Sequence, residues 1–217
     1  LDDLTGGMIA PEVWTIGART SMGKSAVALH IALKQAQSGL GVLICSMEME
    51  PAEMAMRITS ALCLQKGHRI EHSSMRTGNL TEAQMRTFIE ATREFQELPI
   101  IITPSKMRSS GAVMAEARAA ERAFADRKDD PVKLGSIIVD YVQRMRVAGS
   151  DGRVDEITEA MRIMKDLASN HACPVIPLAQ INRGSDLRAT EGKGSIPRPR
   201  LTLVLSGRSP LSGMRSL

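Results

Sequence analysis

Residues 13–33 read VWTIGARTSMGKSAVALHIAL, in which an apolar, strand-like run leads through small and polar residues into a helix-like pattern. The segment from Ala18 to Ser25 fits the pattern G-x-x-x-x-G-K-[ST], with Ala in the first place. Between a strand and a helix, such a segment presents successive backbone N–H groups and a helix N-terminus to an anion. The stretch therefore predicts a loop that holds a nucleoside triphosphate.

Three residues of this loop have separate expected roles. Gly23 lets the backbone approach the phosphates, and Lys24 reaches the outer phosphates as an exposed point charge. The hydroxyl of Ser25 takes one place on Mg²⁺. The nucleotide-binding residues predicted in the loop are Ala18, Arg19, Thr20, Ser21, Met22, Gly23, Lys24 and Ser25.

Strand-like and helix-like segments alternate along most of the chain. Strands are expected at 12–17, 41–46, 99–103, 135–141 and 173–180. Helices are expected at 23–38, from Pro51 to about Gly67, from Thr81 onward with a Thr81–Gln84 capping box, from Ser110 to about Lys128, and around 154–167. Because the strands are apolar throughout, the pattern predicts an α/β fold, with a mostly parallel sheet and helices on both faces. We expect the strand at 41–46 to lie close to the first strand.

Acidic residues follow two of these strands. Asp140 ends an apolar strand and suits a second contact to Mg²⁺, made through water. Its neighbour is Tyr141 rather than Glu, so the group that positions the attacking water must come from elsewhere. Glu48 and Glu50, just beyond residues 41–46, are the candidates, because ligands gather at the carboxyl ends of parallel strands. Both also suit an exposed acidic pair before a helix.

A neutral amide, Gln180, ends the last expected strand, where it can contact the γ-phosphate and respond to its loss. Between Arg183 and Leu217 the chain carries seven basic and two acidic residues. This segment suits either phosphate contacts or a solvated end. Aromatic residues make up only 2%, too few for a base-stacking platform, so any nucleic acid would be bound through its phosphates. The candidate DNA contacts are Arg183, Arg188 and Lys193.

The composition fits a cytoplasmic protein of one ordinary α/β domain. The 217 residues are 43% hydrophobic and 24% charged, without a run of 18 apolar residues or a signal-peptide pattern. The first residue is Leu rather than Met, which is consistent with a fragment. Three widely spaced cysteines are expected to be buried thiols of a reducing compartment.

Several segments together resemble the motor domain of the DnaB-type replicative helicases, which belong to the RecA-like superfamily. The segments are LDDLTGGM (1–8), ARTSMGKSA (18–26), SMEM (46–49), IIVDYVQRM (137–145) and the stretch 153–183, which ends in AQINR. They are similar to that family's approach to the first strand, its phosphate loop, its S-L-E-M, its I-D-Y-L-Q-L-M, and the stretch that ends in S-Q-L-N-R. The resemblance implies a RecA-like ATPase domain over residues 1–200.

The same resemblance implies what the domain does. It implies ATP and Mg²⁺ as cofactors and 5′-to-3′ movement on single-stranded DNA by a hexameric ring, with primase and a helicase loader as further possible partners. It favours Glu48 over Glu50 as the catalytic carboxylate, because Glu48 takes the place of the family's motif Glu. It also makes Gln180 the γ-phosphate sensor.

The resemblance ends near residue 200. Residues 201–217 contain no acidic residue and lack the family's L-R-E-S-G and K-x-R-x-G signatures, so we expect a divergent or truncated tail. A chain of this kind should bind ATP, hydrolyse it slowly and not unwind DNA alone. Two other interpretations remain open: a RecA/RadA-like recombination ATPase, and a truncated ATP-binding remnant without helicase activity.

Overall fold

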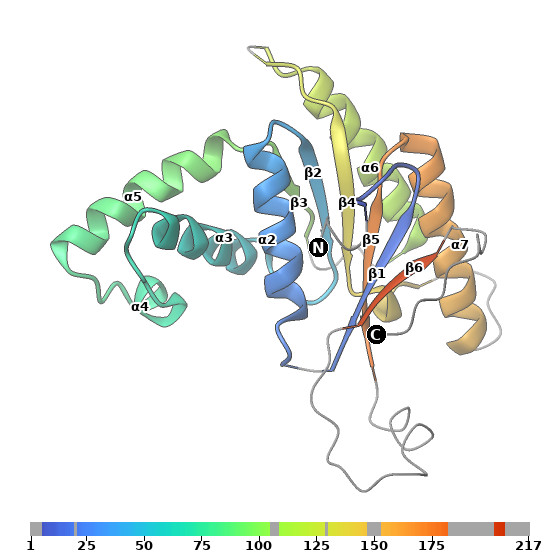
Figure 1. Cartoon of the computed structure of the whole chain (residues 1–217), viewed down its shortest axis with the longest axis horizontal. Helices are drawn as coiled ribbons and strands as arrows, with labels where there is room; N and C mark the ends of the chain where they lie inside the picture. The colour runs from blue at the N-terminus through green and yellow to red at the C-terminus, as the bar shows by residue number, and fades with distance from the viewer. Residues whose placement is uncertain are drawn as a thin grey trace, which may run out of the picture.

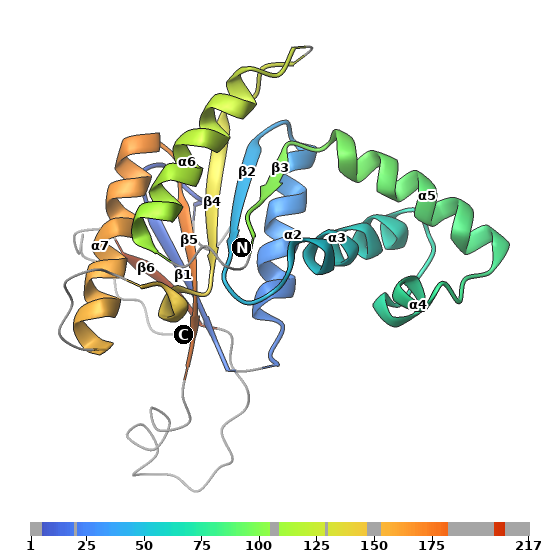
Figure 2. The same cartoon turned by 180° about the vertical axis from the view of Figure 1, so that it is seen from behind.

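The computed structural model describes residues 6–19, 21–104, 109–128, 130–146, 153–181 and 202–206. Within them a sheet is covered by helices on both faces, which confirms the predicted α/β fold (Figures 1 and 2). The strands are β1 (Val13–Ala18), β2 (Gly41–Ser46), β3 (Ile100–Ile102), β4 (Leu134–Asp140), β5 (Val175–Gln180) and β6 (Thr202–Ser206). The helices are α2 (Lys24–Gln37), α3 (Pro51–Gln65), α4 (His72–Thr77), α5 (Glu82–Glu97), α6 (Ser110–Ala125) and α7 (Arg153–His171), with a 3-10 turn, η1 (Val142–Arg144).

The strand order is β3-β2-β4-β5-β1-β6, with β1 to β5 parallel and β6 antiparallel to β1. The expectation that residues 41–46 lie close to the first strand is wrong, because β4 and β5 lie between β2 and β1. A helical crossover can pass over several strand positions, and later parts of the chain fill those positions here. The carboxyl ends of β1 to β5 still meet at one edge.

The antiparallel strand β6 pairs along most of β1, from Val13 with Ser206 to Gly17 with Thr202. The sequence analysis placed these residues in the divergent tail. The division between an ATPase domain over residues 1–200 and a tail over 201–217 stays a prediction. Thr202–Ser206 of that tail add a strand to the same sheet.

Two apolar layers hold the sheet between its helices. In β2, Val42 and Ile44 pack on the side of α2 and α3, whereas Leu43 and Cys45 pack on the side of α6 and α7. Every residue of β2 is buried, because alternate side chains point to opposite faces and both faces are covered. This explains why the strand has no polar alternation in the sequence.

The predicted helices form close to their expected bounds. At the start of α5, the Thr81 hydroxyl accepts a hydrogen bond from the Gln84 backbone N–H, and the Gln84 side chain accepts one from the Thr81 N–H. This confirms the capping box. Pro51 is the first residue of α3, where its missing N–H costs nothing. The short helix α4 was not predicted, since six residues are too few for a periodic pattern.

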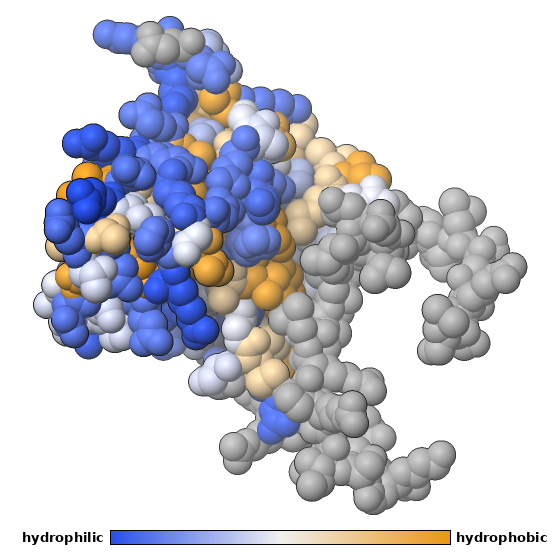
Figure 3. All heavy atoms as spheres, turned by 60° about the vertical axis from the view of Figure 1, so that its left-hand side comes forward, coloured by the Kyte–Doolittle hydropathy of each residue, from blue (hydrophilic) through white to orange (hydrophobic). Residues whose placement is uncertain are grey.

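Helices α3, α4 and α5 extend to one side of the sheet, and their outer surface is mostly polar (Figures 1 and 3). Leu64, Met85 and Ile89 are exposed apolar side chains on α3 and α5. Within the described residues, no helix combines the length and the apolar character that a membrane span requires.

All three cysteines are buried free thiols, as predicted from their spacing. Burial raises the pKa of Cys45 to about 12, and burial likewise raises the pKa of Cys173 to about 12. Both thiols therefore stay protonated at neutral pH and are poor nucleophiles.

The first residue of β2, Gly41, is packed so closely against α6 that a larger side chain does not fit. A Cβ atom on Gly41 would lie 2.6 Å from Cδ2 of Phe124, a buried ring. We expect Gly41→Ala to lower the free energy of unfolding by about 1–3 kcal/mol, because the ring must shift within a tight core. Denaturant unfolding followed by the fluorescence of Trp14, the sole tryptophan, measures the change.

The matched control is Gly111→Ala in the first turn of α6, where, apart from the chain neighbours and the backbone of the same helix, no atom of the described residues lies within 4 Å of the added Cβ. This variant should be as stable as the original chain or slightly more stable, since Ala favours helices. Equal unfolding energies for both variants would contradict the proposed steric conflict at Gly41.

Candidate nucleotide-binding site

A pocket of about 610 Å³ opens where the phosphate loop faces the end of β2 and the start of α3. Seven lining residues come from the loop and the start of α2: Ala18, Arg19, Ser21, Gly23, Lys24, Ser25 and Ala26. Four come from the segment after β2: Glu48, Met49, Glu53 and Arg57. The end of β5 contributes Gln180. The structure thus brings most of the predicted site residues to one edge of the sheet, at the carboxyl ends of the strands.

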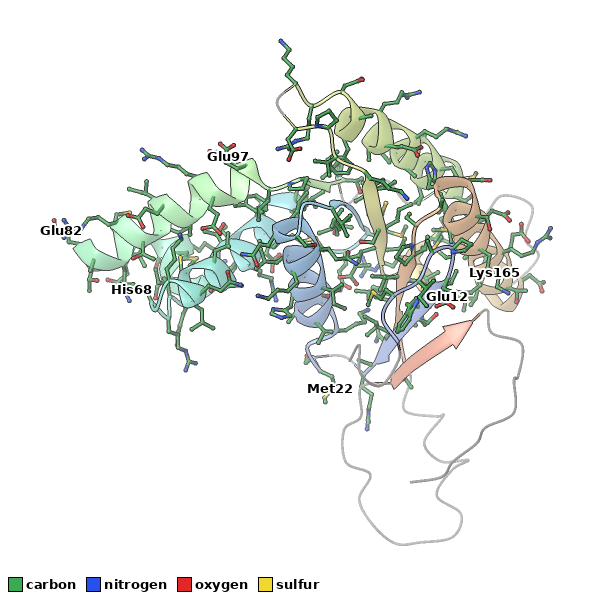
Figure 4. The ribbon with its side chains drawn as sticks, turned by 45° about the horizontal axis from the view of Figure 1, so that its top comes forward. Glu12, Met22, His68, Glu82, Glu97 and Lys165 are labelled. Atoms are coloured by element: carbon green, nitrogen blue, oxygen red, sulfur yellow. The ribbon has the colours of Figure 1, made fainter. Side chains whose placement is uncertain are left out.

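The loop turns into α2 through Gly23, which has a φ of 79° and caps the helix. A glycine suits this position because its backbone is left-handed. Apart from its two chain neighbours, no atom of the described residues lies within 4 Å of a Cβ built there, so the conformation rather than crowding requires glycine in the free protein. The first N–H groups of α2 therefore open toward the pocket, as an anion site needs. Met22, labelled in Figure 4, points away from the sheet and does not line the pocket.

A buried carboxylate joins the loop to the end of β4. The Ser25 hydroxyl donates a hydrogen bond of 2.6 Å to Asp140 Oδ2, and Lys24 Nζ lies 3.4 Å from Asp140 Oδ1. Lys24 was expected to be exposed, which is wrong, because only 13% of its side chain is accessible. Its ammonium group lies beside Asp140 and 4.3 Å from the centre of the Tyr141 ring, two favourable partners for a desolvated cation.

These residues fit a magnesium ion. Asp140 Oδ1 is buried and accepts no hydrogen bond from the described residues, although Lys24 is close to it. Asp140 as a whole is 2% exposed. A hydroxyl and a carboxylate supply the hard oxygen ligands that Mg²⁺ prefers, and Mg²⁺ commonly takes its other ligands from water and phosphates. Ser25 would therefore hold the ion directly and Asp140 would hold it through water, as the sequence predicts.

The two candidate carboxylates after β2 lie in different places. Glu48 lines the pocket, with about half of its side chain exposed. Glu50 is the N-cap residue of α3 and is not among the residues that line the pocket. This geometry supports Glu48 as the group that could orient a water molecule at a bound triphosphate, and its role stays a prediction.

Gln180 is fixed by a residue that the sequence analysis did not select. The Gln143 side chain donates to the Gln180 carbonyl and accepts from the Gln180 N–H, both at 3.1 Å. This pair ties the end of β5 to η1, the turn after Asp140. A Gln three residues after the strand-ending Asp was visible in the sequence, but nothing in its spacing indicated this partner.

Sequence reasoning also missed Glu53 and Arg57, which line the pocket from the first two turns of α3 and form an ion pair of 3.0 Å. Their i,i+4 spacing indicates a pair on one helix face. It does not indicate that this face lies opposite the phosphate loop. The pocket lining therefore carries cations from two parts of the chain, Arg19 and Lys24 of the phosphate loop and Arg57 of α3.

Four predicted site residues lie outside the described residues: Thr20 of the phosphate loop and the candidate DNA contacts Arg183, Arg188 and Lys193. Their roles stay predictions.

Known proteins match this chain over most of its length. The family model for the DnaB-like helicase C-terminal domain matches residues 1–198. The chain is 32% identical over 192 residues to the replicative DNA helicase DnaB of Synechocystis sp., covering 88% of this chain and 21% of that protein. It is 32% identical over 191 residues to the replicative DNA helicase DnaC of Bacillus subtilis, covering 87% of this chain and 39% of that protein. The chain therefore spans less than half the length of these relatives.

Two solved structures share the fold. One, described as an ATPase domain, has a TM-score of 0.74 at 24% identity, covering 86% of this chain and 63% of that one. A DnaB-like replicative helicase, described with its interactions with primase, has a TM-score of 0.73 at 23% identity, covering 88% of this chain and 45% of that one. Because the family model matches residues 1–198 of 217, the chain belongs to the DnaB-like helicase C-terminal domain family.

Proposed function

We propose that this chain is the ATP-driven motor domain of a replicative DNA helicase. The observation that carries the proposal is one pocket in which a phosphate loop faces Glu48 and Gln180. Asp140 accepts a hydrogen bond from Ser25 of that loop. The pocket and its surroundings thus hold the predicted groups for the phosphates, the Mg²⁺ ion and the attacking water. Family membership supports the same reaction.

Each residue of the site has a separate proposed role in ATP hydrolysis. The loop N–H groups and Lys24 bind the triphosphate, while Ser25 would hold Mg²⁺ directly and Asp140 would hold it through water. When bound, Mg²⁺ supplies positive charge that stabilises the phosphate oxygens during transfer. Glu48 accepts a hydrogen bond from the attacking water and orients it toward the γ-phosphate. Gln180 contacts the γ-phosphate through its amide and loses that contact after hydrolysis.

The proposed substrate track is single-stranded DNA, along which a hexamer of such domains moves 5′ to 3′. Arg183, Arg188 and Lys193 follow Gln180 by 3, 8 and 13 residues, so a change at the γ-phosphate can pass along the chain to basic side chains. Primase, which one structurally similar helicase is described as contacting, and a helicase loader are proposed partners. The proposed location is the replication machinery in the cytoplasm.

ATP binding that depends on Mg²⁺ tests the nucleotide part of the proposal. We expect the chain to bind a fluorescent ATP analogue with Mg²⁺ and more weakly with excess EDTA. Forked DNA with either a 5′ or a 3′ single-stranded tail tests direction in an assembled ring that contains this domain, where only the 5′-tailed fork should be unwound. Absence of nucleotide binding would contradict the ATPase proposal, and unwinding of the 3′-tailed fork would contradict the direction.

A further inference from the structure

The ring of Tyr141 contacts two cations that belong to different elements. Lys24 Nζ of the phosphate loop is 4.3 Å from the ring centre, and the guanidinium carbon of Arg144 is 5.4 Å from it. Arg144 Nε also donates a hydrogen bond of 3.0 Å to the Tyr141 hydroxyl. The ring is thereby held both by the phosphate loop and by η1.

Arg144 also reaches the candidate catalytic carboxylate. Its Nη2 lies 3.8 Å from Glu48 Oε1, with 35% and 50% of the two side chains exposed. An ion pair this open contributes little to stability. The hydrogen bond to Tyr141 raises the pKa of Arg144 above its usual value, so the side chain stays charged throughout the neutral range. What the pair can do is restrict the directions that the Glu48 carboxylate takes.

We propose that Arg144 and Tyr141 are positioning residues, through which the phosphate loop and Glu48 are linked, so that Glu48 is oriented according to whether the loop is occupied. This inference rests on the proposed function, because it requires that the loop binds a triphosphate and that Glu48 acts on water.

The contacts form an unbroken series: Lys24, the Tyr141 ring, Arg144 and Glu48. A triphosphate attracts the Lys24 ammonium more strongly than an aromatic face does, since charge-assisted contacts to phosphate exceed cation–π contacts. As Lys24 turns to the phosphates, the ring loses one of its two cations, and Arg144 moves with the hydroxyl it donates to. Glu48, which already lines the pocket, changes the direction of its carboxylate with Arg144 when a phosphate is there to be attacked.

The cation at position 144 belongs to this chain and is absent from the family pattern that its sequence resembles. In IIVDYVQRM, Arg144 stands where the pattern I-D-Y-L-Q-L-M has Leu. A leucine could neither donate to Tyr141 nor pair with Glu48. Arg144→Leu is therefore a direct test that also preserves a side chain of similar bulk.

The kinetic experiment is ATP hydrolysis in a single turnover, with the chain in excess over ATP. Arg144→Leu should lower the rate about tenfold, as expected when a reacting group is misplaced, while affinity for a fluorescent ATP analogue stays within about twofold. Arg144→Lys should recover part of the rate, because it keeps the charge. In a Glu48→Gln background, Arg144→Leu should cause no further loss.

The control is Arg146→Leu. Arg146 lies two residues away and pairs with Glu156 at 3.6 Å, outside the pocket. The Arg146→Leu variant should hydrolyse ATP at the same rate as the original chain. A rate for Arg144→Leu equal to that of the original chain, or a further loss in the Glu48→Gln background, would overturn the proposal.

A second measurement does not depend on hydrolysis. Tyr141 is the sole tyrosine, so labelled tyrosine gives NMR signals from one known ring. Adding a non-hydrolysable ATP analogue should shift these signals, and Arg144→Leu should shift them before any nucleotide is added. If the analogue binds and the signals stay in place, the link is refuted while the proposed function stands. If the analogue does not bind, the proposed function itself fails.

Discussion

Replacing Lys24 with methionine should lower the affinity for ATP about 10²-fold or more, with the fold retained. A charge-assisted hydrogen bond contributes up to about 3 kcal/mol, which corresponds to a factor of about 10² in the dissociation constant. Methionine keeps the apolar stem of the lysine but not its charge. Titration with a fluorescent ATP analogue measures the loss, and circular dichroism shows whether the chain stays folded.

The stability of the Lys24→Met variant must be measured separately, because Lys24 lies beside the buried Asp140 carboxylate. Removing the ammonium leaves that carboxylate with its 2.6 Å hydrogen bond from Ser25. Some loss of stability is therefore expected, and the binding experiment must run well below the unfolding temperature of the variant. Lys34→Met, on an exposed position of the same helix α2, is the matched control and should bind ATP normally. Equal affinity in a folded Lys24→Met variant would contradict the phosphate-loop assignment.

The fold class could be predicted because its signals are local. The apolar runs that became β2 and β4, and the Gly-Lys-Ser that begins α2, need no knowledge of the rest of the molecule. Strand order is different, because it depends on which later segment fills the position beside β1. The prediction that β2 lies close to β1 failed for this reason, since β4 and β5 come between them.

The candidate site divides in the same way. Ser25, Asp140, Glu48 and Gln180 were selected because each lies at the start of a helix, or at or just beyond the end of a strand, at the edge where parallel strands place their ligands. The residues that support them were missed. Gln143 and Arg144 lie in η1, a three-residue turn whose side-chain directions follow from the path of the backbone rather than from any periodicity. The burial of Lys24 was missed too, because it depends on Asp140, which is far away in the sequence.

Replacing Glu48 with glutamine should leave ATP binding intact and lower the rate of hydrolysis by a factor on the order of 10² or more. A carboxylate accepts a hydrogen bond from the attacking water and can take its proton, whereas an amide of the same shape cannot take the proton. Because Glu48 lines the pocket, we expect the substitution to slow the step in which the water reacts. Single-turnover hydrolysis gives the rate, and a fluorescent ATP analogue shows that binding is unchanged.

The neighbouring acid provides the control for this prediction. Glu50→Gln removes the same charge two residues away, at the N-cap of α3, and should change the rate of hydrolysis little. The two variants share any general effect of losing a negative charge near the phosphates, such as tighter binding of ATP. Their difference therefore isolates the proton-accepting role. If Glu50→Gln causes the larger loss of hydrolysis, the alignment of SMEM with the family segment is displaced by two residues, and the water is oriented from the start of α3 rather than from the end of β2.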